Sequence, residues 1–202
     1  MKVLSNAEVK QWFAGFPQGS EYVRSVDTEL FFAHSEANCV DVGYPVKVEQ
    51  FPFLARYLAT VGYGPLDFRG AVIWITEWGV WNPLDESPGY RIVEAMCAAA
   101  GQPTSFEAGS AFRFRADELD QAIGMLLQPM IFGWDAYYYP SWSYGQDQFF
   151  QHVSHDSFAT IVTRTKDFYA KVLGELAEIA INAEPGRDLQ VRRFCRDTDA
   201  HA

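Results

Sequence analysis

Cysteine is scarce in this chain and shows no pairing pattern. The 202 residues include three cysteines, Cys39, Cys97 and Cys195, which are far apart and form no Cys-x-x-Cys pair. An odd number at wide spacing argues against a disulfide framework and against a zinc ribbon. The sequence also lacks the N-terminal apolar run of a signal peptide, and its apolar runs stay far below the roughly 18 residues that span a bilayer. We therefore expect a cytoplasmic protein that does not enter a membrane.

Basic residues are outnumbered by acidic ones. The chain has 16 Lys and Arg against 26 Asp and Glu, which gives a formal net charge of −10. Such a field repels phosphate backbones and anionic membrane surfaces, so we expect neither nucleic acid nor a membrane as a partner. The same field attracts a basic protein or a cationic ligand, although solubility alone also explains the charge. The basic cluster around Arg192 and Arg193 has aspartates nearby, which is typical of a solvated surface.

The short motifs of nucleotide, metal and serine chemistry are absent. The sequence has no phosphate-binding glycine loop, no His-Glu-x-x-His, no Gly-x-Ser-x-Gly and no EF-hand loop. Their absence lowers the expectation of an enzyme without removing it, because many active sites assemble from scattered residues. We expect no cofactor.

The chain does contain the apolar material for a core, with 49% hydrophobic and 16% aromatic residues. This composition argues against a disordered chain. Helical periodicity and capping signals, such as the capping box of Ser5 and Glu8, predict helices, whereas alternating or continuous apolar runs predict strands. The expected helices are about 6–16, 52–61, 88–100, 117–127 and 166–180, and the expected strands lie within 21–33, 68–76, 111–115, 134–139, 148–154 and 158–164.

This order of elements predicts an α+β (or mixed α/β) fold. Helices and strands alternate first, and three consecutive strands then form an antiparallel meander. The expected architecture is a single layered domain, residues 1–182, with a mixed central sheet and helices on at least one face. Residues 183–202 are expected to form a C-terminal tail that adds at most one strand.

Two carboxylates are candidates for catalysis. Glu77 lies beside Trp78 and close to Trp81, just beyond the apolar strand at 68–76, and Asp135 begins the meander. Ligand sites in layered folds often lie outside strand ends, and a carboxylate beside indole rings suits a sugar-processing site. In the alternative interpretation, the indoles close the end of the core while Glu77 faces water.

The segment around His152, His155 and Asp156 has the residue types of a metal site. On an extended strand positions 152 and 155 point to opposite faces, so a shared ion requires a turn between them and a distant third ligand such as His34. Histidine and aspartate are also ordinary turn residues. We therefore expect no metal. The acidic cluster at Asp117 is similarly explained by the start of a helix, which favours negative charge.

Aromatic residues are concentrated in residues 132–150, FGWDAYYYPSWSYGQDQFF. Strand alternation places Trp134 on one face and Asp135, Tyr137 and Tyr139 on the other, so both faces of this strand are aromatic. At most one of these faces can be fully buried without also hiding Asp135. Tyr137 and Tyr139, together with Trp78 and Trp81, are therefore candidates for binding residues.

The loop that follows Pro140 contains Trp142 and Tyr144, and a loop at this position belongs on the surface. Tyrosine and tryptophan supply rigid contact area, so these rings predict a binding surface unless they fold back over the sheet. We expect an acidic, non-catalytic protein-binding domain, of the kind found in inhibitors, immunity proteins or accessory proteins of mobile elements. The alternative is a small-molecule or carbohydrate-processing enzyme with a cleft around Glu77 and Asp135.

Overall fold

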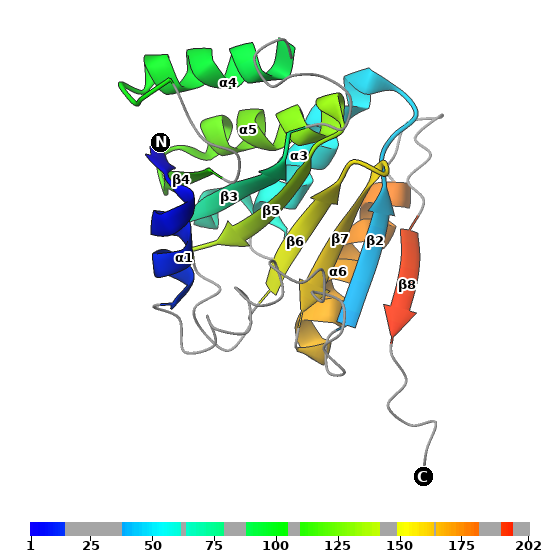
Figure 1. Cartoon of the computed structure of the whole chain (residues 1–202). Helices are drawn as coiled ribbons and strands as arrows, with labels where there is room; N and C mark the ends of the chain where they lie inside the picture. The colour runs from blue at the N-terminus through cyan, green and yellow to red at the C-terminus, as the bar shows by residue number, and fades with distance from the viewer. Residues whose placement is uncertain are drawn as a thin grey trace.

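Strands from the whole length of the chain assemble into one sheet in the computed structural model, which describes residues 1–14, 38–61, 64–78, 88–104, 110–141, 149–163, 165–181 and 191–195. The described strands form an eight-stranded sheet in the order β1-β4-β3-β5-β6-β7-β2-β8 (Figure 1). Their bounds are β1 Lys2–Leu4, β2 Asn38–Gly43, β3 Gly70–Glu77, β4 Ala111–Arg115, β5 Asp135–Pro140, β6 Phe149–Ser154, β7 Phe158–Thr163 and β8 Val191–Cys195.

The α+β layered architecture is confirmed, but the sheet is not mixed. All pairings between the described strands are antiparallel. The expectation of a mixed sheet came from the alternation of helices and strands in the first part of the chain. The continuous apolar run in β3 indicated a strand covered on both faces. That strand is indeed buried from Gly70 to Ile75. Its cover comes from helices on one face and from α1 on the other, and this arrangement does not require parallel neighbours.

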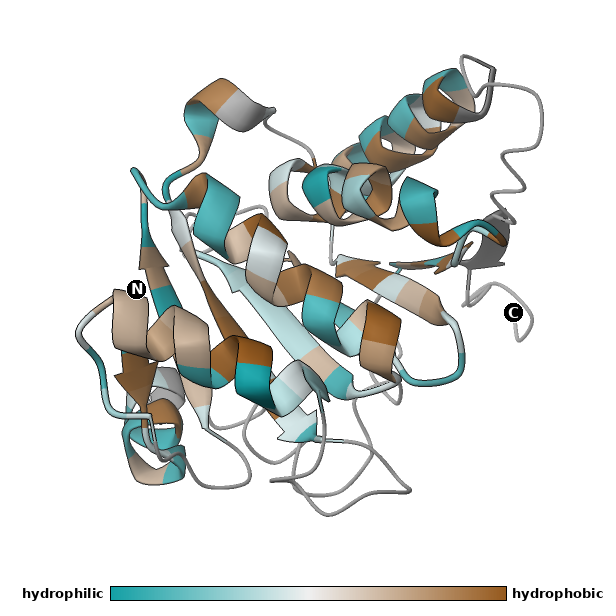
Figure 2. Cartoon of the chain, turned by 90° about the horizontal axis from the view of Figure 1, so that it is seen from above, coloured by the Kyte–Doolittle hydropathy of each residue, from teal (hydrophilic) through white to brown (hydrophobic). Residues whose placement is uncertain are grey.

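Helices cover the sheet mainly on one face. The helix layer contains α3 (Phe51–Thr60), α5 (Leu119–Phe132), α6 (Lys166–Ile181) and, outside α5, α4 (Pro88–Ala99). Figure 2 shows apolar residues recurring along these helices, which is the pattern of a helix that buries one stripe. Helix α1 (Asn6–Ala14) packs on the opposite face, because its Val9 joins a cluster with Trp74 of β3.

The core therefore has two parts, one on each face of the sheet. The larger part lies under the helix layer and includes Ile73, Tyr138 and Trp134. The smaller part includes Tyr139 and Phe150 and packs against α1. The aromatic residues of β5 are thus divided between the two faces. Tyr138 is buried under the helix layer, whereas on the other face Tyr139 is buried and Tyr137 and Asp135 are half-buried.

The antiparallel meander is confirmed in β5, β6 and β7. Tyr137 of β5 pairs with His152 of β6, and Phe150 of β6 pairs with Val162 of β7. The turn between β6 and β7 contains Ser157 with a φ of 68°. This turn brings His155 back toward the start of β5, which is important for the site described below.

Helix ends follow the local signals except in α5. The Ser5 amide donates to Glu8 Oε2 at 2.8 Å and the Glu8 amide to Ser5 Oγ at 3.3 Å, which confirms the capping box. Helix α5 continues through Pro129 to Phe132 and ends at Gly133, whose φ of 66° allows the left-handed conformation. Pro129 has no amide to donate to the Met125 carbonyl, and the helix nevertheless continues for about one more turn before Gly133 ends it.

The remaining predictions concern the segment at 21–33 and the C-terminal tail. The strands expected within 21–33 lie outside the described residues. Strand β8 lies in the tail at 183–202 and pairs with β2. The short 3-10 helices η2 (Val48–Gln50) and η3 (Pro65–Asp67) flank α3. None of the helices in the described part of the chain combines the length and apolar character that crossing a bilayer requires.

Candidate functional site

An irregularity at the end of β3 places Glu77 beside Asp135. The register between β3 and β5 shifts between Ile75 and Glu77, so that Glu77 rather than Thr76 pairs with Asp135. Such a bulge redirects the side chains that follow it, and bulges are frequent next to functional sites. One carboxylate oxygen of Glu77 lies within 4.8 Å of one of Asp135. The convergence of these two candidate residues is the central feature of the site.

Two histidines approach Asp135 from the neighbouring strand and its turn. His152 Nε2–H donates to Asp135 Oδ1 at 3.1 Å. His155 Nδ1–H donates to Asp135 Oδ2 at 2.5 Å, and the His155 backbone amide donates to Oδ1 at 3.2 Å. The ring of His152 also stacks on Tyr137, with centroids 4.8 Å apart. Asp135 therefore holds the β6–β7 turn against the start of β5.

Glu77, Asp135 and His155 influence one another's pKa values. Partial burial alone would raise the pKa of Asp135, but hydrogen bonds from His152 and His155 hold it well below its usual range. Burial and the adjacent Asp135 carboxylate raise the pKa of Glu77. The hydrogen bond to Asp135 raises the pKa of His155. The cluster thus pairs one firmly ionised carboxylate with a second carboxyl group that holds its proton more tightly than usual.

The structure combines residues that the sequence had assigned to two separate candidate sites. Glu77 and Asp135, the catalytic candidates, meet His155, one of the metal candidates, and the ligand atoms of these three residues all lie within 4.8 Å of one another. His152 is not one of these three residues, but its ring donates a hydrogen bond to Asp135. Asp156 lies on the outer side, with Oδ1 3.5 Å from His155 Nε2 and 68% of its side chain exposed. His34 lies outside the described residues.

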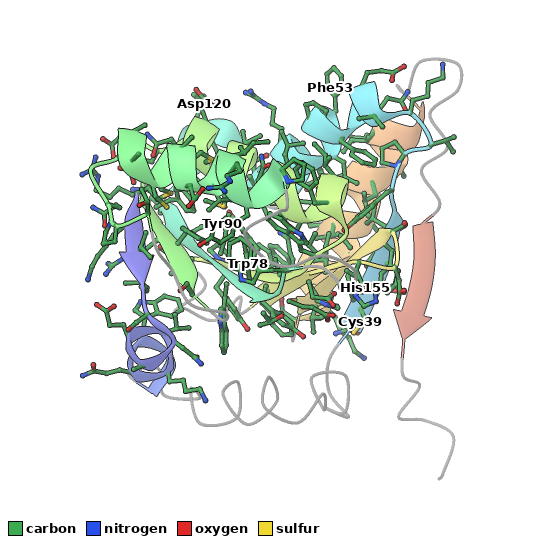
Figure 3. The ribbon with its side chains drawn as sticks, turned by 45° about the horizontal axis from the view of Figure 1, so that its top comes forward. Cys39, Phe53, Trp78, Tyr90, Asp120 and His155 are labelled. Atoms are coloured by element: carbon green, nitrogen blue, oxygen red, sulfur yellow. The ribbon has the colours of Figure 1, made fainter. Side chains whose placement is uncertain are left out.

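Trp78 does not line a cleft, contrary to its assignment as a binding residue. Its side chain is 5% exposed, and its ring centroid lies 5.8 Å from that of Tyr90 and 4.8 Å from that of Trp134. Figure 3 shows Trp78 and Tyr90 facing each other beneath α4. The indole follows β3 directly into the helix layer and fills space there, as the alternative interpretation held.

The other aromatic binding candidates are distributed unevenly. Tyr139 is 5% exposed and stacks on Phe150, so its ring belongs to the smaller core. Tyr137 is half-buried beside His152. Trp81, Trp142 and Tyr144 lie outside the described residues, and their role as contact residues stays a prediction from the sequence.

The acidic residues at the start of α5 have local partners. Glu118 is 7% exposed, and its carboxylate accepts hydrogen bonds from the Met1 ammonium group and from the Arg115 amide, the latter at 2.8 Å. Burial alone would raise the pKa of Glu118, but these hydrogen bonds lower it. Asp117 pairs with the Arg115 side chain at the surface. The cluster thus connects β1, β4 and α5, in agreement with a structural role.

Replacement of Glu118 with glutamine tests this structural role. We expect the free energy of unfolding to fall by about 2 kcal/mol near pH 7, because a buried charge-assisted pair is lost. The folded-state pKa lies below the unfolded value of about 4.3, so the contribution is present above that pH and disappears as pH falls through the folded pKa. Urea denaturation near pH 7 and near pH 3 should therefore show the two proteins converging in acid. Asp117→Asn is the exposed control, and an equal loss in both variants contradicts the assignment.

An exposed apolar patch was missed by the sequence analysis. Val46, Val48 and Phe53 are 80%, 62% and 60% exposed; the two valines lie between β2 and α3, and Phe53 lies in the first turn of α3. Beside them is a groove of about 170 Å³ between α3 and α6, lined by Pro45, Gln50, Phe53, Leu54, Tyr57, Leu176 and Ile179. The sequence contained a signal, since two valines alternate with charged residues in an irregular segment. We refer to Val46, Val48 and Phe53 as the α3 patch.

Comparison with known proteins does not identify the chain: no protein-family model matches it, and neither a curated protein nor a solved structure is significantly similar. Function is therefore argued from the site and the surface alone.

Proposed function

We propose that this chain is an acidic, non-catalytic protein-binding domain of the cytoplasm whose partner is a basic protein. Domains of this character occur among inhibitors, immunity proteins for bacterial toxins and accessory proteins of mobile elements. The observation that carries the proposal is the α3 patch, in which three large apolar side chains are exposed and one of them, Phe53, lines an apolar groove.

The α3 patch and its groove together have the form of a protein contact rather than of a substrate pocket. Exposed apolar side chains that gather in one place on a folded protein mark interaction sites. The groove volume of about 170 Å³ is below the roughly 300–1,000 Å³ of small-molecule sites. It suits one apolar side chain of a partner, anchored between α3 and α6, with the α3 patch excluding water around it. Figure 3 shows Phe53 projecting outward from α3, away from the sheet.

The charge around the α3 patch favours a basic partner. The net charge of the chain is −10. At the groove itself, Glu175 approaches the Tyr57 hydroxyl. Glu49 and Glu178 are the sequence neighbours of two lining residues. The nearby basic residues include Lys47 and Arg56. Electrostatic complementarity of this kind speeds encounter and selects partners more than it adds affinity.

The alternative, a carbohydrate-processing enzyme at Glu77 and Asp135, is less well supported. Glycosidases hold their two carboxyl groups about 5 Å apart or more, so that a sugar carbon or a water fits between them. The nearest oxygens of Glu77 and Asp135 lie within 4.8 Å of each other, and a ring nitrogen of His155 lies within the same distance of both, which leaves little space for a sugar carbon or a water between the carboxyl groups. Neither Glu77 nor Asp135 is among the residues that line the groove beside the α3 patch.

Site-specific crosslinking in cells tests the proposal. A photo-crosslinking amino acid at position 53 should capture a basic protein, whereas the same group at Ile92, which is 43% exposed on α4, should not. The captured protein is then identified and purified, and its affinity is measured by calorimetry. We expect the double variant Val48→Ala and Phe53→Ala to weaken binding at least about tenfold, because exposed apolar anchors carry most of an interface's energy.

Ile92→Ala is the matched control and should bind as the wild type does. Binding should also weaken as salt is added, because an attraction between opposite surface charges is screened. The proposal fails if the double variant and the control bind equally, if the captured protein is acidic, or if the main product is a crosslink between two copies of this chain.

A further inference from the structure

Glu77, Asp135 and His155 reach one point from three separate parts of the chain. Glu77 follows the bulge at the end of β3, Asp135 begins β5, and His155 lies in the β6–β7 turn. One ligand atom from each lies within 4.8 Å of the other two. We propose that these three residues bind a single divalent transition-metal ion, with Zn²⁺ the best match. This site lies apart from the protein-binding surface proposed above and adds a second activity to the chain.

The donor set indicates the class of ion. Two carboxylates supply two negative charges, and one imidazole nitrogen supplies a borderline-soft donor, a combination that suits Zn²⁺ or Mn²⁺. Ca²⁺ takes six to eight oxygen ligands and Mg²⁺ prefers oxygen ligands and water, so neither has a use for the imidazole. The Glu77 and His155 side chains are exposed, whereas Asp135 is only 14% exposed beneath them. An ion can therefore enter from solvent and keep water in its remaining coordination positions.

The closeness of the two carboxyl groups is a further argument for a cation. Carboxylates whose oxygens lie within 4.8 Å of each other repel, and a positive ion between them removes this repulsion. A bound ion would take the place of the proton on His155 Nδ1, and it would interact with all three side chains at once. On this interpretation, the bulge in β3 places Glu77 beside Asp135 so that both residues can bind the same ion.

Neighbouring groups hold the ligands in position. His152 Nε2–H donates to Asp135 Oδ1, whereas Oδ2 accepts from His155 Nδ1. On the far side of the His155 ring, Nε2 lies 3.5 Å from Asp156 Oδ1. A carboxylate behind a ligating histidine fixes the tautomer and orientation of its ring, and this arrangement recurs in zinc sites. His152 and Asp156, both metal candidates in the sequence, thus become supporting residues.

Metal titration of the purified chain tests the inference. After treatment with a chelator and its removal, the wild type should bind one Zn²⁺ per chain in calorimetry, with a dissociation constant in the micromolar range or below. Mg²⁺ added in the same way should give no comparable signal. Glu77→Gln and His155→Gln should each weaken Zn²⁺ binding at least about tenfold, because each removes one of three ligands.

The control variant is Asp67→Asn, which removes an exposed carboxylate in η3, just before β3 begins rather than where it ends. It should bind Zn²⁺ as the wild type does. Circular dichroism establishes that each variant is folded, and Glu77 is suited to this test because its side chain is exposed. The inference is overturned if binding is substoichiometric, or if Glu77→Gln and Asp67→Asn bind alike. Because the α3 patch shares no residue with this site, failure here leaves the protein-binding proposal intact.

Discussion

Replacing Gly70 with alanine should destabilise the protein by about 3 kcal/mol or more, since two separate penalties fall on the same residue. Gly70 opens β3 with a φ of 101°, a conformation that side chains rarely adopt. A Cβ at this position would also lie 2.5 Å from the carbonyl oxygen of Phe114 in β4. That oxygen belongs to the strand that pairs with β3, so it cannot move without disturbing the sheet.

Gly101→Ala separates the two penalties. Gly101 has a φ of 65°, but a Cβ there would meet nothing within 4 Å. This variant should lose only about 1 kcal/mol, the penalty for the left-handed conformation. Urea denaturation followed by circular dichroism measures both variants. If both variants lose the same free energy of unfolding, the collision with Phe114 contributes nothing and the prediction for Gly70 is wrong.

Replacing Trp134 with alanine should lower the free energy of unfolding by about 3–5 kcal/mol, the usual loss for a large buried aromatic ring. Trp134 is 1% exposed, and its ring centroid lies 5.6 Å from that of Phe132 and 4.8 Å from that of Trp78. The ring also contacts α4 at Gly89, where a side chain would collide with it. The variant therefore leaves a cavity between β5 and α4 that the helix backbone cannot fill.

The matched control is Phe53→Ala, which also removes an aromatic ring but from a side chain that is 60% exposed. We expect it to change stability by less than about 1 kcal/mol. Thermal melting of both variants gives the comparison. A large loss for Phe53→Ala would show that the α3 patch supports the fold, and the binding experiment would then have to use Val48 alone.

Local signals in the sequence were sufficient for most elements of the fold. The apolar run of β3, the alternation in β4 and the three strands of the meander all appear where the patterns place them. The capping hydroxyl of Thr165 accepts a hydrogen bond from the Phe168 amide at 3.4 Å, as expected for the start of α6. These features depend on residues close in sequence, so a single sequence contains them.

Features that depend on residues far apart in the sequence could not be predicted from the sequence alone. The antiparallel direction of all described pairings depends on how each connection crosses the sheet, and apolar content does not encode that direction. The convergence of Glu77 with Asp135 depends on one inserted residue in β3, which shifts the register after Ile75. The burial of Trp78 depends on where α4 packs. Residue types indicated Glu77, Asp135 and His155 as candidates, whereas their convergence could be found only in the tertiary structure.

The pairing of the sheet has a consequence for synthesis of the chain on the ribosome. Asn38 of β2 pairs with Thr163 and with Cys195, and Leu4 of β1 pairs with Ala111. When β1 and β2 leave the exit tunnel, none of these partners has yet been made. A nascent chain must therefore keep two early apolar segments unpaired until much of the remaining polypeptide has been translated, and this is the interval in which it most needs a chaperone.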